Sequence, residues 1–280
     1  GAVVLRVFSQ DALGHQQAPS VVKLGPRELI AEERVAFEQV EAVLGNDAPS
    51  LRVFADLKGR AGLKYAYASM GTGDVRTFKS LYMDEASQEQ IDRILGTVFD
   101  DVLGRFSRVS IYDRLPLLDY YEFSPRHADG VRKRVAAIMG IAPDARELDF
   151  GDGYRLPNLA DFYGSKLDEI SRPHGESHYV SWVHGDLNGA NILIDDRDNT
   201  WLIDFFHAHR GHVLRDVIKL ENDVQYIFTP LADERELSQA LLITRALREV
   251  RDLMVPLPEC PAGVECRALR RAWSTLRTLR

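Results

Sequence analysis

Two kinds of hydrophobic pattern divide this chain. Before residue 70, β-branched runs typical of strands flank a stretch with helical spacing. After it the pattern is mainly helical, with one β-like region at residues 179–206. Strands are expected at Val3–Phe8, Val21–Leu24, Leu51–Phe54, Leu63–Ser69, Tyr179–Val183, Ile192–Ile194 and Trp201–Phe205. The chain is therefore predicted to fold as a small sheet with one helix, a joint at Met70–Gly73, and a larger helical half that carries a β-hairpin.

Composition narrows the functional class. The 280 residues are 45% hydrophobic and 28% charged, which is typical of a globular protein. The net charge of −7 argues against a general nucleic-acid binder. The longest apolar or glycine stretch is Val135–Ala142, far shorter than the roughly 20 residues of a membrane span. Only two cysteines are present, which favours the reducing cytoplasm over a secreted disulfide scaffold.

The hairpin region brings together the residue types that phosphoryl transfer needs. Asp186 and Asn191 flank a loop between strands, and Asp204 is expected to end the next strand of the hairpin. Because a hairpin places its two ends side by side, Asn191 and Asp204 should face one another. A carboxylate and an amide oxygen suit Mg²⁺, which also keeps positions for water and phosphate. Asp186 would then be free to orient or deprotonate a hydroxyl.

The segment His184–Asn191 resembles the catalytic loop of the protein-kinase-like superfamily, H-R-D-L-x-x-x-N, and Asp204-Phe205-Phe206 stands in the D-F-G place. Glycine after the histidine is the habit of the aminoglycoside and choline phosphotransferase branch. The stretch Trp201–Arg215 also resembles the kinase-like ternary-complex-associated domains of bacterial conflict systems. These resemblances imply an α+β, two-lobed kinase-like fold, with a small β-rich N-lobe at residues 1–69 and a larger, mainly helical C-lobe at 70–280.

The N-terminal part contains matches to the kinase-like nucleotide site. Lys23 lies in a V-V-K-L run that looks like V-A-I-K, and Glu33, one turn before Phe37, has the helical phase to meet it. Glu32 is the competing residue. Gly1 would be the last glycine of the phosphate-covering loop, so the first strand and most of that loop are expected to be missing from this chain.

The resemblance implies an ATP- and Mg²⁺-dependent phosphotransferase that moves the γ-phosphate to a hydroxyl of a small molecule. Asp186 would act on the hydroxyl, and Asn191 and Asp204 would hold the metal. Lys23 would contact the α- and β-phosphates, and adenine would lie over Leu193 near Ser69–Gly73. Asp216, in a G-x-x-x-x-D run, would either brace the catalytic loop or cap a helix.

Two alternative functions stay open, the first because of a departure within the motif and the second because no residue spacing names the acceptor. Asn188 stands where the superfamily usually carries lysine or histidine, and it brings no charge. A catalytically weak nucleotide-binding signalling module of a multidomain conflict system is therefore one alternative, and a kinase acting on protein side chains is another. The expected partner is a small hydroxylated substrate or another domain of a longer protein. A helical insert at residues 105–178 is expected to shape the acceptor pocket.

Overall fold

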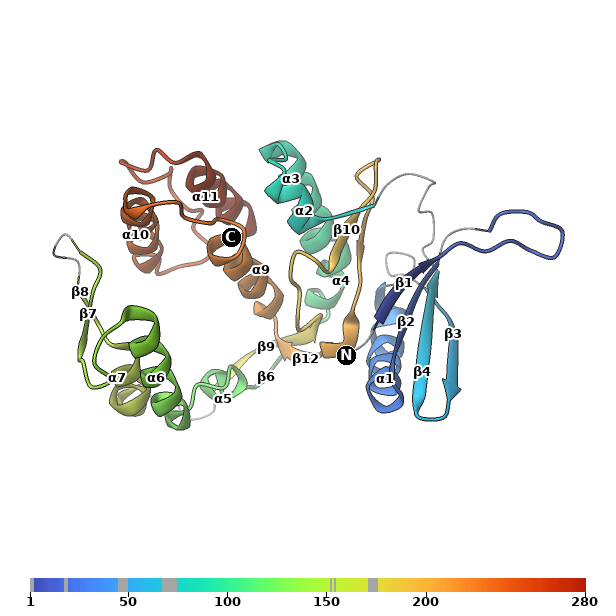
Figure 1. The fold of residues 1–280 in the computed structure, drawn as a ribbon, viewed down its shortest axis with the longest axis horizontal. Coiled ribbons are helices and arrows are strands. Elements are labelled where there is room, and N and C mark those ends of the chain that lie inside the picture. The colour runs from blue at the N-terminus through green and yellow to red at the C-terminus, as the bar shows by residue number, and fades with distance from the viewer. Residues whose placement is uncertain are drawn as a thin grey trace. The chain divides into compact units, whose positions relative to one another are not determined.

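The computed structural model describes residues 3–17, 20–44, 50–66, 75–151, 153, 155–170 and 176–280. The chain forms two compact units, one made of Gly1–Ser110 with Ser181–Arg280 and the other of Ile111–Val180. Gly1 and the joint predicted at Met70–Gly73 lie outside the described residues. Figure 1 labels many of the elements of each unit.

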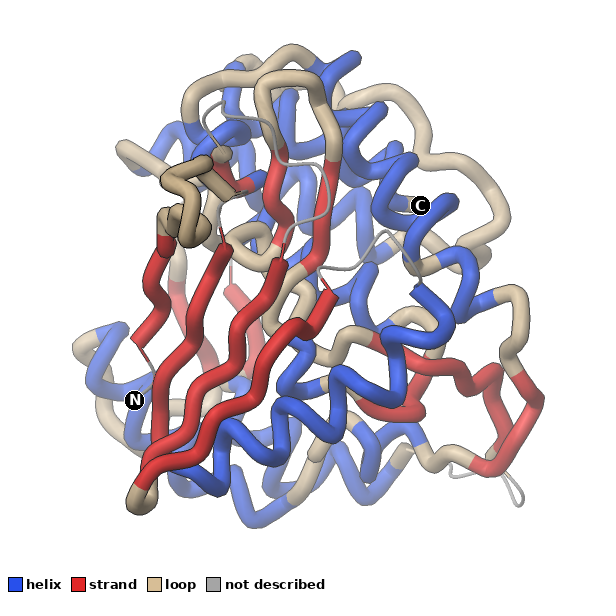
Figure 2. Tube along the Cα trace, turned by 90° about the vertical axis from the view of Figure 1, so that its right-hand side faces the viewer, coloured by secondary structure: helices blue, strands red, loops and turns tan. Residues whose placement is uncertain are grey.

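The first unit begins with a four-stranded antiparallel sheet and one helix. The sheet order is β1-β2-β4-β3, and Figure 2 shows its strands side by side. The bounds are β1 (Val3–Val7), β2 (Ser20–Pro26), α1 (Arg27–Leu44), β3 (Ser50–Leu57) and β4 (Arg60–Ala66). Lys23 pairs with Leu63 in the register, so their side chains share one face of the sheet. That face also receives α1, through the buried side chains of Phe37 and Val40.

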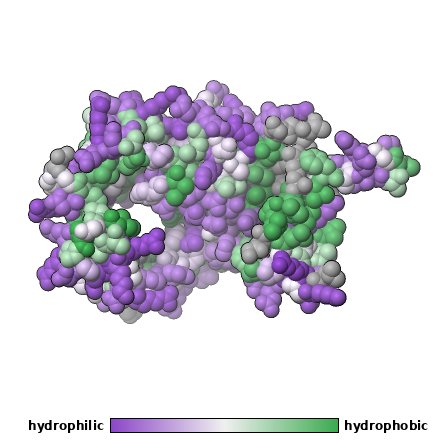
Figure 3. Space-filling view, viewed as in Figure 1, coloured by the Kyte–Doolittle hydropathy of each residue, from purple (hydrophilic) through white to green (hydrophobic). Residues whose placement is uncertain are grey.

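The opposite face of this sheet is apolar and open. Val3, Leu24 and Val53 are 52%, 40% and 50% exposed. Figure 3 shows the corresponding green patch over the strands of this sheet. The residues around it enclose a groove of about 580 Å³, which Lys58, Arg60 and Lys64 also line. Strict alternation along the strands thus places Lys23 on the covered face and Lys64 on the open one.

The remainder of the first unit is mainly helical around a short three-stranded sheet, β11-β10-β5. Its elements are β5 (Arg76–Thr77), α2 (Phe78–Met83), α3 (Gln88–Gly96), a π-helical segment (Thr97–Val102), α4 (Gly104–Ser107), β10 (Ile192–Ile194), β11 (Thr200–Leu202), a 3₁₀ turn (Phe205–His207), β12 (His209–His212), α9 (Arg215–Tyr226), α10 (Glu234–Arg248) and α11 (Arg267–Leu279). Ile91, Val98, Leu220 and Trp273 belong to its core. The predicted α+β class, with a strand-rich start and a larger helical part, is confirmed.

The second unit combines short helices with the pairing of β6 to the first part of β9, which continues into the first unit, and of β7 to β8. Its elements are β6 (Ile111–Arg114), α5 (Leu117–Tyr120), a 3₁₀ turn (Pro125–His127), α6 (Ala128–Met139), β7 (Glu147–Asp149), β8 (Arg155–Pro157), α7 (Leu159–Asp161), a π-helical segment (Phe162–Lys166), α8 (Leu167–Glu169) and β9 (Ser177–Val183). The sequence predicted mostly helix before residue 170. Strands of three or four residues are too short to show alternation, and β6, β7 and β8 were therefore missed.

Candidate functional site

Lys23 lies between two carboxylates that come from distant parts of the chain. Its Nζ is 2.8 Å from Glu33 Oε2 on α1 and 2.9 Å from Asp204 Oδ1 after β11. Glu33 is buried, whereas Glu32 is exposed. The predicted ion pair is therefore formed by Glu33, and the helical phase inferred from the sequence is confirmed.

The surroundings of Glu33 hold it in place. The hydroxyl of Tyr65 donates to Glu33 Oε1 at 2.9 Å. Phe37, one turn further along α1, packs edge-on against Tyr65 and Phe205, with ring centroids 5.6 Å and 5.7 Å apart. Burial alone would lower the pKa of Lys23, but its hydrogen bonds to Glu33 and Asp204 outweigh this effect and raise the pKa. Lys23 therefore keeps its positive charge at neutral pH.

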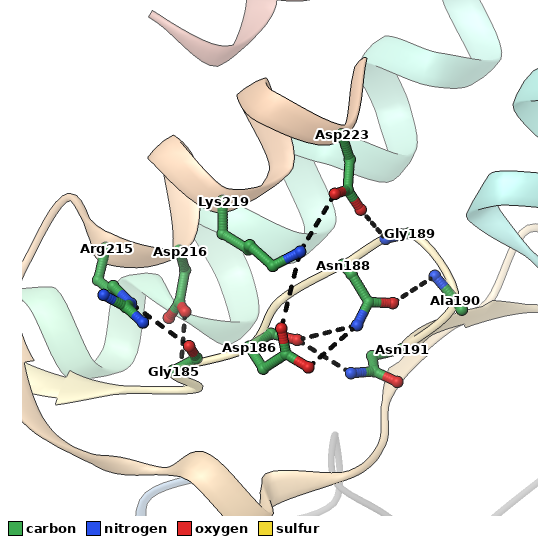
Figure 4. A network of polar contacts seen from close by, with 10 residues as sticks. All are labelled: Gly185, Asp186, Asn188, Gly189, Ala190, Asn191, Arg215, Asp216, Lys219 and Asp223. Carbon is green, nitrogen blue, oxygen red and sulfur yellow. Dashed lines mark hydrogen bonds and ion pairs between the residues drawn. The ribbon is translucent and has the colours of Figure 1, made fainter. Parts of the chain in front are cut away.

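The loop between β9 and β10 is closed by short-range hydrogen bonds, as Figure 4 shows. Asn188 N and Asn191 Nδ2 both donate to the backbone oxygen of Asp186, at 2.8 Å and 2.9 Å. Asn188 Oδ1 accepts from the backbone N–H of Ala190 at 2.9 Å. The Asp186 carboxylate is 39% exposed and accepts from Asn188 Nδ2 at 3.3 Å. The curled loop thus leaves the carboxylate of Asp186 accessible to a ligand.

Asp204 does not end a strand, contrary to the prediction. The strand β11 stops at Leu202, and Asp204 has φ 66° and ψ 58°, in the left-handed region, just before a 3₁₀ turn. Aspartate is one of the few non-glycine residues that adopt this conformation readily, because its short polar side chain can bond locally. The backbone oxygen of Asn191 accepts from Ile203 N at 3.0 Å, so Asn191 lies next to the residue that precedes Asp204.

The chemistry of Asn191 and Asp204 fits a magnesium ion. The amide nitrogen of Asn191 donates to the backbone oxygen of Asp186, and Oδ1 of Asp204 forms an ion pair with Lys23. Within the described residues, Asn191 Oδ1 and Asp204 Oδ2 take part in no hydrogen bond or ion pair. The Asp204 side chain is 42% exposed. One exposed carboxylate and one amide oxygen of a largely buried side chain are donors that Mg²⁺ accepts when phosphate and water complete its shell.

Asp216 braces the loop from the first turn of α9. Its Oδ2 accepts from the backbone N–H of His184 at 2.7 Å and its Oδ1 from that of Gly185 at 2.9 Å. His184 Nε2 donates to the backbone oxygen of Ile203 at 2.8 Å, which ties the loop to the segment before Asp204. Of the two roles that the sequence left open, the brace is the one that these contacts show; the residue before α9 is Leu214, with no side-chain cap.

Replacing Asp216 by alanine is expected to destabilise the protein by about 2–4 kcal/mol, because two buried backbone donors lose their acceptor. Urea denaturation of the variant measures this loss. Asp196→Ala is the control, because Asp196 is exposed. Equal unfolding free energies for the two variants would contradict the bracing role.

The family described as "Ternary complex associated domain 9" matches residues 1–146 and 141–280. The chain belongs to this family. The suspected membership among ternary-complex-associated domains is thereby confirmed. In this family member, the lysine strand, the glutamate helix, the Asp–Asn loop and the aspartate after the hairpin occur in the order predicted for a protein-kinase-like fold. The contacts of Lys23 join the strand to the glutamate helix and to the aspartate.

The chain is also similar in part to one further protein by sequence and to several by structure. The probable bifunctional tRNA threonylcarbamoyladenosine biosynthesis protein of Methanospirillum hungatei is 35% identical over 96 residues, 31% of this chain and 18% of that protein. The chain thus spans less than a fifth of that relative's length. The aminoglycoside phosphotransferase APH(3'')-Id of Streptomyces rimosus is 17% identical with a TM-score of 0.43, covering 100% of this chain and 89% of that one. The Plasmodium vivax ethanolamine kinase is 14% identical with a TM-score of 0.42, and the match covers 98% of this chain and 77% of that one.

Of the two remaining predicted site residues in this ternary complex associated domain, Leu193 lies among the described residues and Gly1 does not. Leu193 lies in the middle of β10, partly exposed, and pairs with Trp201 on β11 and Thr77 on β5. Gly1 lies outside the described residues, so its predicted place in a phosphate-covering loop stays a prediction.

Sequence reasoning missed two residues of α9 that contact the loop. Asp223 Oδ2 accepts from the backbone N–H of Gly189 at 3.1 Å, and Lys219 Nζ lies 3.2 Å from Asp223 Oδ1. Lys219 also lies 3.7 Å from Asp186 Oδ1. The signal was present, because Asp216, Lys219 and Asp223 follow one another at intervals of three and four residues and so share a helix face.

Two glycines allow the loop to pack closely. Gly185 has φ +85°, and a Cβ there would lie 2.1 Å from the backbone oxygen of His207. A Cβ on Gly189 would lie 2.5 Å from Phe228 Cζ. Side chains at these positions would push the loop away from the 3₁₀ turn on one side and from the core on the other.

No helix among the described residues is both long and apolar enough to cross a membrane.

Proposed function

We propose that this chain binds ATP with Mg²⁺ and transfers the γ-phosphate to a hydroxyl group of a small molecule. The observation that carries the proposal is the ammonium of Lys23, held 2.8 Å from Glu33 and 2.9 Å from Asp204. A flexible lysine stem needs a carboxylate to aim its charge at phosphate oxygens, and the buried Glu33 supplies one.

Glu33 and Asp204, the two partners of Lys23, would have different roles when a nucleotide binds. Phosphate oxygens of the nucleotide would take the place of Asp204 at Lys23, while Glu33 keeps the lysine in position. The carboxylate of Asp204 and the amide oxygen of Asn191 would then hold Mg²⁺, which neutralises phosphate charge when it is bound. Leu193 would contact the adenine ring. Because the reaction consumes ATP, we place it in the cytoplasm.

The transfer part rests on Asp186. Its exposed carboxylate would accept the proton of the acceptor hydroxyl while the hydroxyl oxygen forms a bond to the γ-phosphorus. The bond between the γ-phosphorus and the bridging oxygen breaks, and ADP leaves with that electron pair. Asn188 donates to the Asp186 carboxylate and Asn191 donates to the Asp186 backbone oxygen, so the carboxylate would keep one orientation toward the acceptor.

A second candidate function is nucleotide binding without efficient turnover, as a signalling module within a larger protein. The neutral side chain of Asn188, tied to Ala190 and Asp186 within the loop, favours this alternative. Both candidates predict nucleotide binding at Lys23, and only the first predicts labelled product from a hydroxylated acceptor. Incubation of the chain with γ-labelled ATP and a panel of sugars, polyols, amino alcohols and hydroxylated peptides separates them.

Replacing Lys23 by methionine is expected to weaken ATP binding by roughly tenfold or more, because each hydrogen bond to a charged group contributes about 1.5–3 kcal/mol. Methionine keeps the unbranched stem and removes the charge. Titration calorimetry with Mg²⁺ and ATP measures the change.

The control for this substitution is Lys64→Met, on the opposite face of the same sheet. It removes the same charge and should leave the affinity for ATP near that of the unsubstituted chain. Undetectable ATP binding by the unsubstituted chain, or equal affinity of the Lys23 and Lys64 variants, would contradict the proposed function.

A further inference from the structure

Aliphatic side chains dominate the face of the four-stranded sheet that lies opposite α1. In the register Val3 pairs with Leu24, and Leu24 pairs with Gly62, so these residues lie in one row across that face. A second row, from Leu5 to Val53, runs beside it. Val3, Leu5, Leu24 and Val53 are 52%, 44%, 40% and 50% exposed. Neighbouring aliphatic side chains that stay this exposed mark a site of interaction.

This face is hollow, because a glycine forms part of its floor. Gly62 is buried, and a Cβ there would lie 2.7 Å from Leu24 Cδ2, so the leucine leans over the glycine. The groove encloses about 580 Å³, a volume typical of ligand pockets. A hollow of this size accepts protruding side chains, whereas a flat surface such as a lipid bilayer would leave it unfilled.

Three cations line the groove. They are Lys58, Arg60 and Lys64, and the described lining residues include no carboxylate. None of the three forms an ion pair within the part of the chain that the structure describes. The four strands contain one acidic residue, Asp56, which pairs with Arg27 at 2.7 Å and does not line the groove. The groove is therefore positively charged, although the chain as a whole has a net charge of −7.

The chemistry of this face restricts what can occupy it. The backbone groups of the paired strands bond within the sheet, so an extended segment laid across the face would leave its own N–H and C=O groups without partners. A helix satisfies its own backbone. A second copy of the chain, docked through the same face, would bring two identical sets of cations together. The described lining also holds no aromatic side chain on which nucleic-acid bases could stack.

We propose that this groove binds an amphipathic helix of a partner protein, with aspartate or glutamate on both sides of the apolar stripe of that helix. Aliphatic side chains of the helix would fill the hollow above Gly62, and its carboxylates would pair with Arg60 and Lys64. Lys23 lies on the opposite face of the same sheet. The inference therefore does not depend on the proposed phosphoryl transfer.

The test uses a fluorescently labelled peptide of about 18 residues, or about five helical turns. Leucines spaced at i, i+3, i+4 and i+7 form its apolar stripe, and glutamates lie on both sides of the stripe. A second peptide carries lysines in place of the glutamates, and a third carries a central proline that breaks the helix. In anisotropy titrations we expect the acidic helix to bind roughly tenfold or more tightly than either of the others, and less tightly as NaCl is raised.

Variants of the lining residues assign this binding to the groove. Arg60→Glu combined with Lys64→Glu should reverse the preference, so that the lysine peptide binds more tightly than the acidic one. Val53→Asp should weaken binding of the acidic helix by roughly tenfold, because it places a like charge in the apolar lining. The matched controls are Lys133→Glu and Val109→Asp, at exposed residues that do not line the groove. Both controls should bind like the unsubstituted chain.

The outcomes decide the inference. Equal affinities for the acidic and the basic peptide would overturn it, as would an unchanged charge preference in the folded double variant. Binding of phosphatidylserine vesicles without binding of the acidic peptide would assign the face to a lipid surface and would also overturn it. If the double variant fails to fold, as thermal unfolding would show, Lys58→Asn takes its place, because asparagine suits the left-handed backbone there, φ 45°. That variant should bind the acidic helix more weakly, and an unchanged affinity overturns the inference.

Discussion

Replacing Asp186 by asparagine is expected to lower phosphoryl transfer by roughly a hundredfold to ten-thousandfold, the usual contribution of a general base. Asparagine keeps the shape of the side chain and cannot take the proton of the hydroxyl. Asp186 touches the acceptor and not the nucleotide in the proposed arrangement, so the affinity for ATP should stay near normal. Transfer of label from γ-labelled ATP measures the first quantity, and titration with ATP measures the second.

The control is Asp196→Asn, an exposed aspartate in the turn between β10 and β11. It should retain both transfer and ATP binding. A large loss of ATP affinity in the Asp186 variant would show that this carboxylate serves the nucleotide instead, and the assignment of Asp186 to the acceptor would be wrong.

Replacing Asp204 by alanine is expected to weaken ATP binding in the presence of Mg²⁺ by roughly tenfold to a hundredfold, since a carboxylate that holds a cation is lost. Without Mg²⁺ the loss should be much smaller, or even reversed, because Lys23 would no longer be occupied by Asp204. Titration calorimetry with and without the metal gives the two affinities.

The left-handed backbone of Asp204 requires a matched variant for this experiment. Alanine is strained in that conformation by about 1–2 kcal/mol, whereas asparagine tolerates it. Asp204→Asn therefore removes the charge while keeping the backbone. If both variants lose the same affinity in the presence and in the absence of Mg²⁺, Asp204 is no metal ligand.

The parts of the site that could be predicted are those whose geometry follows from periodicity. Glu33 was placed correctly against Lys23 because Phe37 and Val40 must face the sheet, and a glutamate one turn earlier then lies on the same edge. The sequence also predicted that Asp186 and Asn191 flank a loop between strands, and the structure places this loop between β9 and β10.

The parts that could not be predicted depend on single backbone conformations and on long-range contacts. The sequence carries no signal that the chain turns left-handed at Asp204, because aspartate is common in strand ends and in turns alike. Tyr65 could not be assigned to Glu33 before the register of β4 was known. The π-helical segment at Thr97–Val102 likewise interrupts what reads as one continuous amphipathic stripe.

The anchoring of the loop by α9 has a consequence for how the protein is made. Lys23, Asp186, Asn191 and Asp204 have all been synthesised before residue 216, yet the loop has neither of its two carboxylate anchors until Asp216 and Asp223 follow. A nascent chain that ends before residue 216 therefore holds all four groups, while the loop that carries Asp186 and Asn191 still lacks both anchors. A product released just before α9 would carry the complete motif and lack its fixed geometry, so a premature stop there would give an inactive chain rather than an uncontrolled enzyme.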